Sequence, residues 1–378
     1  MTALEVEIVS AEELRDGDWA LWRAWADADP NLSSPYFRPE FTRTASRISP
    51  DSAVAVFLRG GHVVGFFPHQ RRGGALQPIA APMNDYHAVI AAPGETISLE
   101  DVARLLNPRR LNVNAWVGPA AAGVDRHTVQ VVMPDGFDAW YAERRATHGK
   151  FFKDKERARR SMETELGPLR ATHGIVDTAM LDELIGLKQA QYRRSNRHDV
   201  FACGWTRDLL HAFMDHPTHD GFGGCLTALW AGDHRVAMEF SLFGGDTYHF
   251  WFPAYEPRFA RCSPGILLSM ETMRAVSPRG VTVFDYGFEG EHYKKYFCNG
   301  RRALREAVIL RPGLGAGLSE AAVGVLNVAA RGRGDALRTS VRRRWAAIEA
   351  CETTPINRMK GAAQAVHAAA AKLARPHA

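Results

Sequence analysis

The chain has 378 residues, of which 46% are hydrophobic and 24% charged, and these proportions exclude collagen-like, mucin-like and wholly disordered proteins. Its length predicts two domains of ordinary size and a remainder. The formal net charge is +5, but residues 313–378 contribute +6, with ten Lys or Arg against four Asp or Glu, so the remaining body sums to −1. This distribution disfavours nucleic acid as a partner of the body and favours an anionic partner at the basic C-terminal segment.

The first part of the chain reads as a helix followed by a hairpin. Trp19, Trp22 and Trp25 recur at helical spacing and predict an N-terminal helix with its tryptophans in the core. Two β-rich runs, 53–58 and 62–68, flank a Gly-Gly turn and predict a hairpin. Further strands are predicted at 76–80 and 112–117, and a highly charged helix from 138 to about 165.

The second part repeats this order of elements. A helix is predicted over 178–195, with Thr178 as its N-cap, and another begins near 206. Three runs joined by turns then predict an antiparallel meander. A helix, a buried strand, a short helix and a last strand complete the unit. The meander covers 225–230, 236–243 and 247–251, and the later elements cover 265–276, 281–285, 292–297 and 307–310.

The turn Ser263-Pro264-Gly265 has the pattern of an anion site. Serine is a favoured N-cap and proline a favoured first helical residue, so the free N–H groups of the next helix would face this turn. Arg258 and Arg261 precede it, and two arginines beside a helix N-terminus suit a phosphate group. On these residues alone, an ordinary helix cap after an arginine-containing loop remains an alternative.

The order of elements over residues 15–312 resembles the GCN5-related N-acetyltransferase (GNAT) superfamily. More narrowly, it resembles the CelD-like or BioF2-like branch of exopolysaccharide biosynthesis, which is related to the peptidoglycan FemABX-type aminoacyltransferases. The resemblance rests on GDHRVA at 232–237, on the run 255–268 with its SPGILL, and on FDYG at 284–287 followed by Tyr293-Lys294. In the first half, SPYF at 34–37, NDY at 84–86 and the basic stretch 157–160 also match.

The resemblance implies an α+β fold with tandem GNAT domains. Each domain would be a mixed, mostly antiparallel sheet flanked by helices, over 1–165 and 166–312, with a helical tail over 313–378. It implies an N-acyltransferase that uses acyl-CoA, usually acetyl-CoA, and no metal. The expected acceptor is an amine of an amino sugar or lipid-linked saccharide in exopolysaccharide or envelope synthesis. The C-terminal copy would bind acyl-CoA, and the first copy would help to form the acceptor site.

The resemblance also assigns roles to residues. The donor diphosphate is expected at Arg258, Arg261, Ser263 and Gly265. Glu239 and Asp285 are candidate general bases, with Glu289 and Glu291 as further options, and Tyr293 is the candidate proton donor to the departing thiolate. Solvent exposure of Glu239, a turn role for Asp285 and a surface position for Tyr293 remain open alternatives. The residues expected near the acceptor are Asp85, Tyr86, Trp251, Tyr286 and Lys294.

The rest of the sequence bears on location and on rival functions. No run of about 20 apolar residues and no signal-like N-terminus is present, so we expect a cytoplasmic protein. Five scattered cysteines without a CxxC motif favour a reducing compartment. The stripe Leu337, Val341, Trp345 and Ile348 among arginines predicts an amphipathic helix that binds an anionic membrane, an anionic nucleotide or the protein's own body. Rival functions are a tRNA-dependent aminoacyltransferase and an inactive GNAT-fold sensor or scaffold at the membrane.

Overall fold

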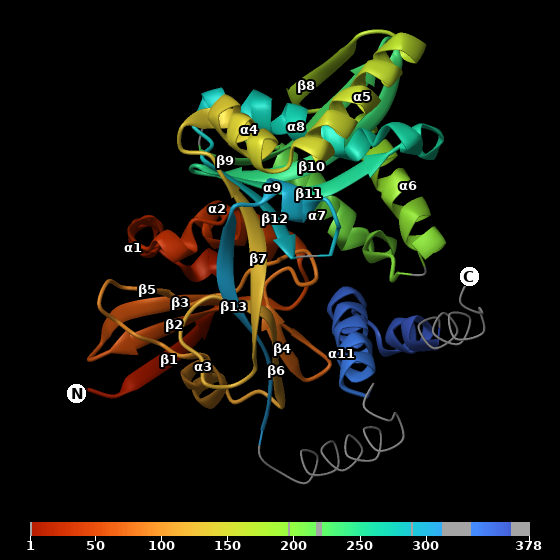
Figure 1. Cartoon of the computed structure of the whole chain (residues 1–378). Helices are drawn as coiled ribbons and strands as arrows, with labels where there is room; N and C mark the ends of the chain where they lie inside the picture. The colour runs from red at the N-terminus through yellow and green to blue at the C-terminus, as the bar shows by residue number, and fades with distance from the viewer. Residues whose placement is uncertain (1, 196, 217–220, 289, 312–333, 364–378) are drawn as a thin grey trace.

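The computed structural model describes residues 2–195, 197–216, 221–288, 290–311 and 334–363 (Figure 1). The first half of the chain contains β1 (Leu4–Val9), α1 (Asp16–Ala28), α2 (Pro39–Ile48), β2 (Ser52–Arg59), β3 (His62–Arg72), β4 (Ala75–Pro78), β5 (Ile90–Ala91), α3 (Leu99–Leu106), β6 (Arg110–Trp116) and β7 (Val124–Val132). Helices α4 (Gly136–Thr147) and α5 (Gly149–Leu166) connect it to the second half.

The second half repeats the plan of the first. It contains β8 (Leu169–Ile175), α6 (Thr178–Ser195), α7 (Gly204–Met214), β9 (Phe222–Ala231), β10 (His234–Gly244), β11 (Thr247–Tyr255), α8 (Pro264–Val276), β12 (Val283–Phe288), α9 (Lys294–Phe297) and β13 (Gly300–Leu310). Short 3-10 helices η4 (Val200–Ala202) and η5 (Pro257–Cys262) lie between these elements, and α11 (Gly334–Cys351) follows them.

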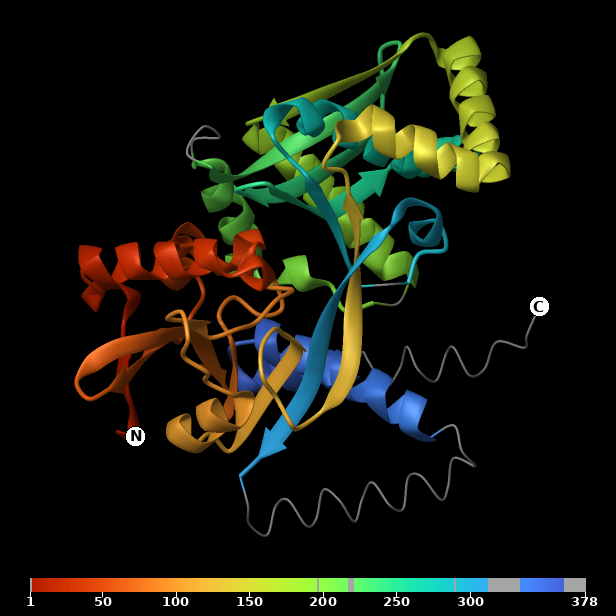
Figure 2. The same ribbon diagram turned by 60° about the vertical axis from the view of Figure 1, so that its left-hand side comes forward.

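The strands form one mixed sheet in which corresponding strands of the two halves follow in the same order from the two opposite edges. Among the described residues the order is β1-β2-β3-β4-β6-β13-β7-β12-β11-β10-β9-β8, with β5 beside β3. The last strand of each half is exchanged: β13 pairs with β6 of the first half, and β7 pairs with β12 of the second. These two long strands run side by side between the halves (Figure 2). The sheet order therefore confirms two copies of one α+β unit and shows that each completes the other.

Helices of both halves share the central core. Trp22 of α1 is fully buried, and its indole N–H donates to the carbonyl of Phe37 at 2.8 Å. Phe41 of α2 and Phe213 of α7 stack with ring centroids 5.1 Å apart. Burying an aromatic side chain of this size contributes on the order of 2–3 kcal/mol. The predicted tryptophan stripe is thus confirmed as core, and the pair Phe41–Phe213 joins the two halves.

Some local predictions were incomplete. The helix predicted over 138–165 is two helices, because the backbone leaves helical geometry at His148 (φ −123°, ψ 40°). The last strand begins at Gly300, seven residues before the predicted start, and β7 and β8 were not predicted. The cap of α6 is Asp177, whose carboxylate accepts from the N–H of Met180 at 3.0 Å, and Thr178 is the first helical residue.

Candidate active site

A cavity of about 760 Å³ lies where β11 and β12 separate. The two strands pair in parallel at three positions, the last being His249 opposite Asp285, and beyond it they diverge. Gly287 has φ +65°, a conformation that favours glycine, where the register of β12 shifts against β7. The cavity has the size of a typical small-molecule site. Its lining includes Met83, Asp85, Lys188, Tyr192, Arg197, His249, Trp251, Pro253, Ser263, Gly265, Tyr286, Gly287, Glu291, Tyr293 and Lys294.

The predicted turn before α8 forms one wall of this cavity. Ser263 occupies the N-cap position, but its side chain does not cap the helix. Instead, its hydroxyl oxygen accepts a hydrogen bond from the ammonium of Lys155 on α5 at 2.9 Å. Ser263 and Gly265 both face the cavity. Pro264 has no N–H, and the N–H groups of Ile266 and Leu267 donate to the preceding carbonyl of Ser263 at 3.0 and 3.2 Å. The turn therefore offers the N–H of Gly265 and the positive end of α8 to an anionic group, with the ammonium of Lys155 beside it.

Arg258 and Arg261 do not join this wall, contrary to the sequence-based expectation. Residues Pro257–Cys262 form the 3-10 helix η5, on which both arginines are exposed, and neither lines the cavity. Arg261 pairs with Glu165, and the guanidinium of Arg258 lies over the ring of Phe259. The cation beside this turn is Lys155, which contacts Ser263 but is not among the residues that line the cavity.

The two halves meet at a polar chain at the base of the cavity. Asp85 of the first half borders the cavity with a side chain that is 31% exposed, and its Oδ2 lies 3.0 Å from Nε2 of His249. Since a carboxylate oxygen accepts, the imidazole N–H is the donor. On its other side, Nδ1 of His249 lies 3.8 Å from Oδ1 of Asp285. His249 thus lies between two carboxylates, one of which is accessible from the cavity.

Asp285 is fully buried, and its carboxylate is hydrogen-bonded by donors of the protein itself. Its carboxylate accepts from the hydroxyl of Tyr86 at 2.7 Å, from the amide of Gln130 at 3.1 Å and from the backbone N–H of Gly287 at 2.7 Å. Neither Asp285 nor Tyr86 lines the cavity. The structure therefore places both behind His249, and not in the reacting position predicted for Asp285 or beside the acceptor as predicted for Tyr86.

Glu239 also lies away from the cavity. Its side chain is fully buried beside β11, where it accepts hydrogen bonds from the hydroxyls of Ser241 and Tyr248. Burial raises the pKa of Glu239 to about 7, because the low-dielectric surroundings disfavour the charged form. The assignment of Glu239 as the base is not supported by this position, and solvent exposure is excluded as well.

Four other predicted residues do border the cavity, namely Trp251, Tyr286, Tyr293 and Lys294. Burial raises the pKa of Tyr293 above its ordinary value, so the phenol stays protonated at neutral pH. The ammonium of Lys294 donates to the carbonyls of Tyr286 at 2.9 Å and Phe288 at 2.6 Å. Lys294 therefore fixes the bulged end of β12 beside the cavity.

The sequence reasoning missed three residues of the site: Lys155, Lys188 and His249. His249 interrupts a run of aromatic residues (YHFWF, 248–252), which was a usable signal. Lys188 lies on the apolar face of α6, where it is 8% exposed, donates to the carbonyl of Pro253 at 3.2 Å, and has its pKa lowered to about 8 by burial. For Lys155 no local signal existed, because its partner Ser263 is 108 residues away.

The equivalent opening in the first half is covered by α11. Strands β4 and β6 separate after Leu76 opposite Leu111, and a pocket of only about 70 Å³ remains there beneath Ala346, Ala347 and Ala350. Of the alternatives for the tail, the described part of α11 shows a helix packed on the body. No helix among the described residues combines the length and apolar character needed to cross a bilayer.

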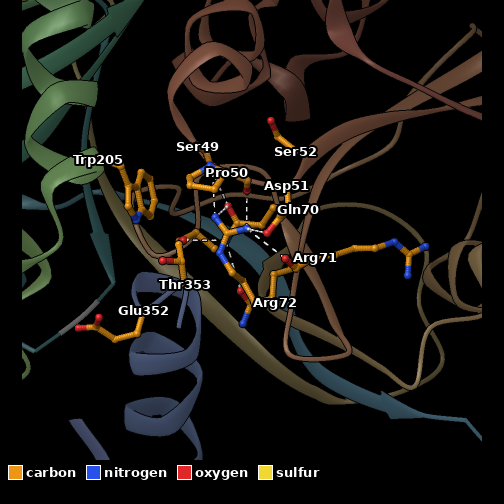
Figure 3. A network of polar contacts seen from close by, with 12 residues as sticks. Ser49, Pro50, Asp51, Ser52, Gln70, Arg71, Arg72, Trp205, Glu352 and Thr353 are labelled. Carbon is orange, nitrogen blue, oxygen red and sulfur yellow. Dashed lines mark hydrogen bonds and ion pairs between the residues drawn. The ribbon is translucent and has the colours of Figure 1, made fainter. Parts of the chain in front are cut away.

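Ion pairs and hydrogen bonds hold α11 in this position. Arg342 and Arg343 contact Glu306, which is 2% exposed, and Arg110 pairs with Glu349. Figure 3 shows the end of α11 near Trp205 of the second half and near the network around Arg72 of the first. The indole N–H of Trp205 donates to the carbonyl of Cys351 at 3.1 Å. The helix therefore contacts both halves of the protein.

In a comparison with known proteins, a family model matches the segment from α5 to the start of α9. Residues 149–295 match the family described as the acetyltransferase (GNAT) domain. No curated protein sequence matches the chain.

Solved structures similar to the chain share little sequence with it. They include the C-terminal domain of a protein described as a lysylphosphatidylglycerol synthetase from Agrobacterium fabrum (12% identity, TM-score 0.48, 82% of this chain and 96% of that one). FemX (11% identity, TM-score 0.48, 80% and 96%) and a tandem GNAT protein from the clavulanic acid biosynthesis pathway (11% identity, TM-score 0.47, 82% and 99%) are also similar. The segment that matches this family contains β11, α8 and β12, which frame the cavity.

Proposed function

We propose that the protein is an N-acyltransferase that transfers an acyl group, with acetyl as the simplest case, from acyl-CoA to an amine. One observation carries this proposal: a single cavity connects the turn at Ser263, which suits an anionic group, with the Asp85–His249 pair, which suits a cation. A thioester donor needs the first site for its diphosphate, and an amine acceptor needs the second. The carbonyl carbon would then lie between them, along β11.

The residues of the donor side fit acyl-CoA as a co-substrate. Lys155, Ser263 and Gly265 would hold the diphosphate, and the pantetheine arm would lie between the diverging strands. A backbone N–H of β11 would stabilise the oxyanion that forms when the thioester carbonyl is attacked. The C–S bond then breaks, and the departing thiolate takes a proton from the hydroxyl of Tyr293, which burial keeps protonated.

The acceptor side is built from both halves. The ammonium of the acceptor would bind the carboxylate of Asp85, which His249 orients through its Nε2 hydrogen bond. This pair would first take one proton from the ammonium, either directly or through water, and so free the lone pair that attacks the thioester carbonyl. The second proton leaves the nitrogen as the amide forms and would return to Tyr293, so that the products are the amide and the CoA thiol. Trp251 offers an aromatic face on the same side, which suits an amino sugar or a lipid-linked saccharide. We place this acceptor in exopolysaccharide or envelope synthesis at the cytoplasmic side of the membrane.

The test measures thiol release from acetyl-CoA in the presence of a panel of amino sugars and other amines. Wild-type protein should release CoA only when an acceptor is present. Asp85→Asn should lower kcat/KM about 100-fold or more, since it removes the charge and the proton acceptor together. Asp125→Asn is the matched control, because Asp125 is exposed and lies outside the cavity lining.

Binding measured by native mass spectrometry separates the rivals. Bound acyl-CoA without turnover on any acceptor would support the inactive sensor, and transfer from charged tRNA but not from acyl-CoA would support the aminoacyltransferase. The charge of −1 outside the tail disfavours the tRNA donor. Either outcome would overturn the proposal.

A further inference from the structure

The end of α11 brings two cysteines together outside the candidate active site. Cys351 is the last residue of α11, and Cys203 occupies the N-cap position of α7, 148 positions earlier in the sequence. The Cys203 sulfur lies 3.5 Å from a carboxylate oxygen of Glu352, and the Cys351 sulfur lies 3.7 Å from the carbonyl oxygen of Val200. Because Glu352 adjoins Cys351 and Val200 lies three residues before Cys203, these two contacts bring the thiols into one cluster. Both are free in this structure.

The two thiols differ in the direction of their pKa shifts and in their exposure to solvent. The neighbouring Cys351 thiol and His198 lower the pKa of Cys203, whereas the Cys203 thiol and burial raise the pKa of Cys351. The N-terminus of α7 also favours a thiolate at Cys203. Cys203 is 8% exposed and Cys351 only 1%. Cys203 is therefore suited to attack a reagent from outside, and Cys351 to react second, from within the protein.

We propose that Cys203 and Cys351 form a redox-active dithiol, a modification site for low-molecular-weight disulfides such as glutathione disulfide. The Cys203 thiolate attacks one sulfur of the reagent, which forms a mixed disulfide and releases one thiolate that takes up a proton. Cys351 then loses its proton and attacks the Cys203 sulfur, which forms the Cys203–Cys351 bond and releases the second small thiol. Two protein thiols are oxidised, and one disulfide is reduced to two thiols.

This bond would fix α11 to the second half beside the candidate active site. Cys351 contacts Val200 of η4, and Val200 lines the cavity. The bond would close a loop between positions 203 and 351. A cross-link lowers the conformational entropy of the unfolded chain, and this stabilisation of the folded state grows with the length of the loop. We therefore expect the oxidised protein to unfold several degrees higher than the reduced one. The site is independent of the proposed acyl transfer, since its formation needs no turnover.

The experiment treats the full chain with glutathione disulfide, blocks remaining thiols and maps the products by mass spectrometry. Wild-type protein should lose two hydrogen atoms and give a 203–351 cross-linked peptide that a reductant removes. Cys351→Ser should stop at a glutathione adduct on Cys203, and Cys203→Ser should give neither product. Cys298→Ser, which removes a half-buried thiol elsewhere, should behave like wild type.

Three outcomes would overturn the proposal. One is an adduct on Cys298 before any on Cys203, and another is the absence of a trapped adduct in Cys351→Ser. The third is a cross-link that forms only after denaturation. Unfolding temperatures of each variant under reducing conditions distinguish a failure to fold from a failure to react.

Discussion

Lys155→Ala tests the donor wall, because Lys155 is the cation that the tertiary structure adds to the turn before α8. Its ammonium lies 2.9 Å from the hydroxyl oxygen of Ser263, and its side chain is half-buried. A charge-assisted hydrogen bond contributes about 1.5–3 kcal/mol, and solvent screening at a partly exposed site reduces this to roughly 1–2 kcal/mol. We therefore expect the KM for acetyl-CoA to rise about 5- to 30-fold, with kcat changed less than about twofold.

The assay compares two donors that share one thioester. Acetyl-CoA carries the diphosphate, whereas S-acetylpantetheine lacks both the diphosphate and the nucleotide. Thiol release is followed with each donor, at saturating acceptor, for wild type, Lys155→Ala and Lys153→Ala. Lys153 is on the same helix but exposed, so its removal changes the net charge without touching the turn. Only Lys155→Ala should lose affinity, and only for acetyl-CoA.

Two results would refute this reasoning. An equal rise in KM for both donors would mean that Lys155 acts on the thioester end or on the fold. An unchanged KM for acetyl-CoA would mean that the diphosphate binds elsewhere. In the second case, the turn at Ser263 could no longer be taken as the donor site, even if acyl transfer were observed.

Tyr293→Phe should lower kcat about 100-fold with little change in the KM for acetyl-CoA. Tyr296→Phe, in the helix α9 that follows Tyr293, should change neither value, and equal losses in both variants would contradict the role of Tyr293. Glu239→Gln addresses stability against pH. Burial raises the pKa of Glu239 to about 7 from 4.5, so the folded state binds more protons than the unfolded state between these values, and stability falls as the pH rises through them. As the pH rises from 4 to 8, the free energy of unfolding of the variant, measured in urea, should increase by up to about 3 kcal/mol relative to that of wild type. Identical pH profiles of the two proteins would contradict a raised pKa of Glu239.

Local elements were well predicted because their signals are short-range. The helix over residues 178–195 was predicted with the bounds that the structure shows, and the three-strand meander and the tryptophan stripe of α1 are present. In each case the apolar residues recur with the period of a helix (3.6) or a strand (2), which can be seen in a short stretch of sequence. The arginines before α8 show the limit of this reasoning: η5 turns both outward, and a 3-10 turn of six residues leaves little trace in the composition.

The sequence by itself determined two α+β units in tandem and the helix start at Ser263-Pro264, because periodicity and helix-start residues can be recognised in consecutive residues alone. Only the tertiary structure decided which residues surround the turn at Ser263. The exchange of β7 and β13, the pairing of Asp85 with His249 across 164 positions and the contact of Lys155 with Ser263 across 108 depend on how the two halves join. Such contacts follow from the packing of distant segments, which no local pattern encodes.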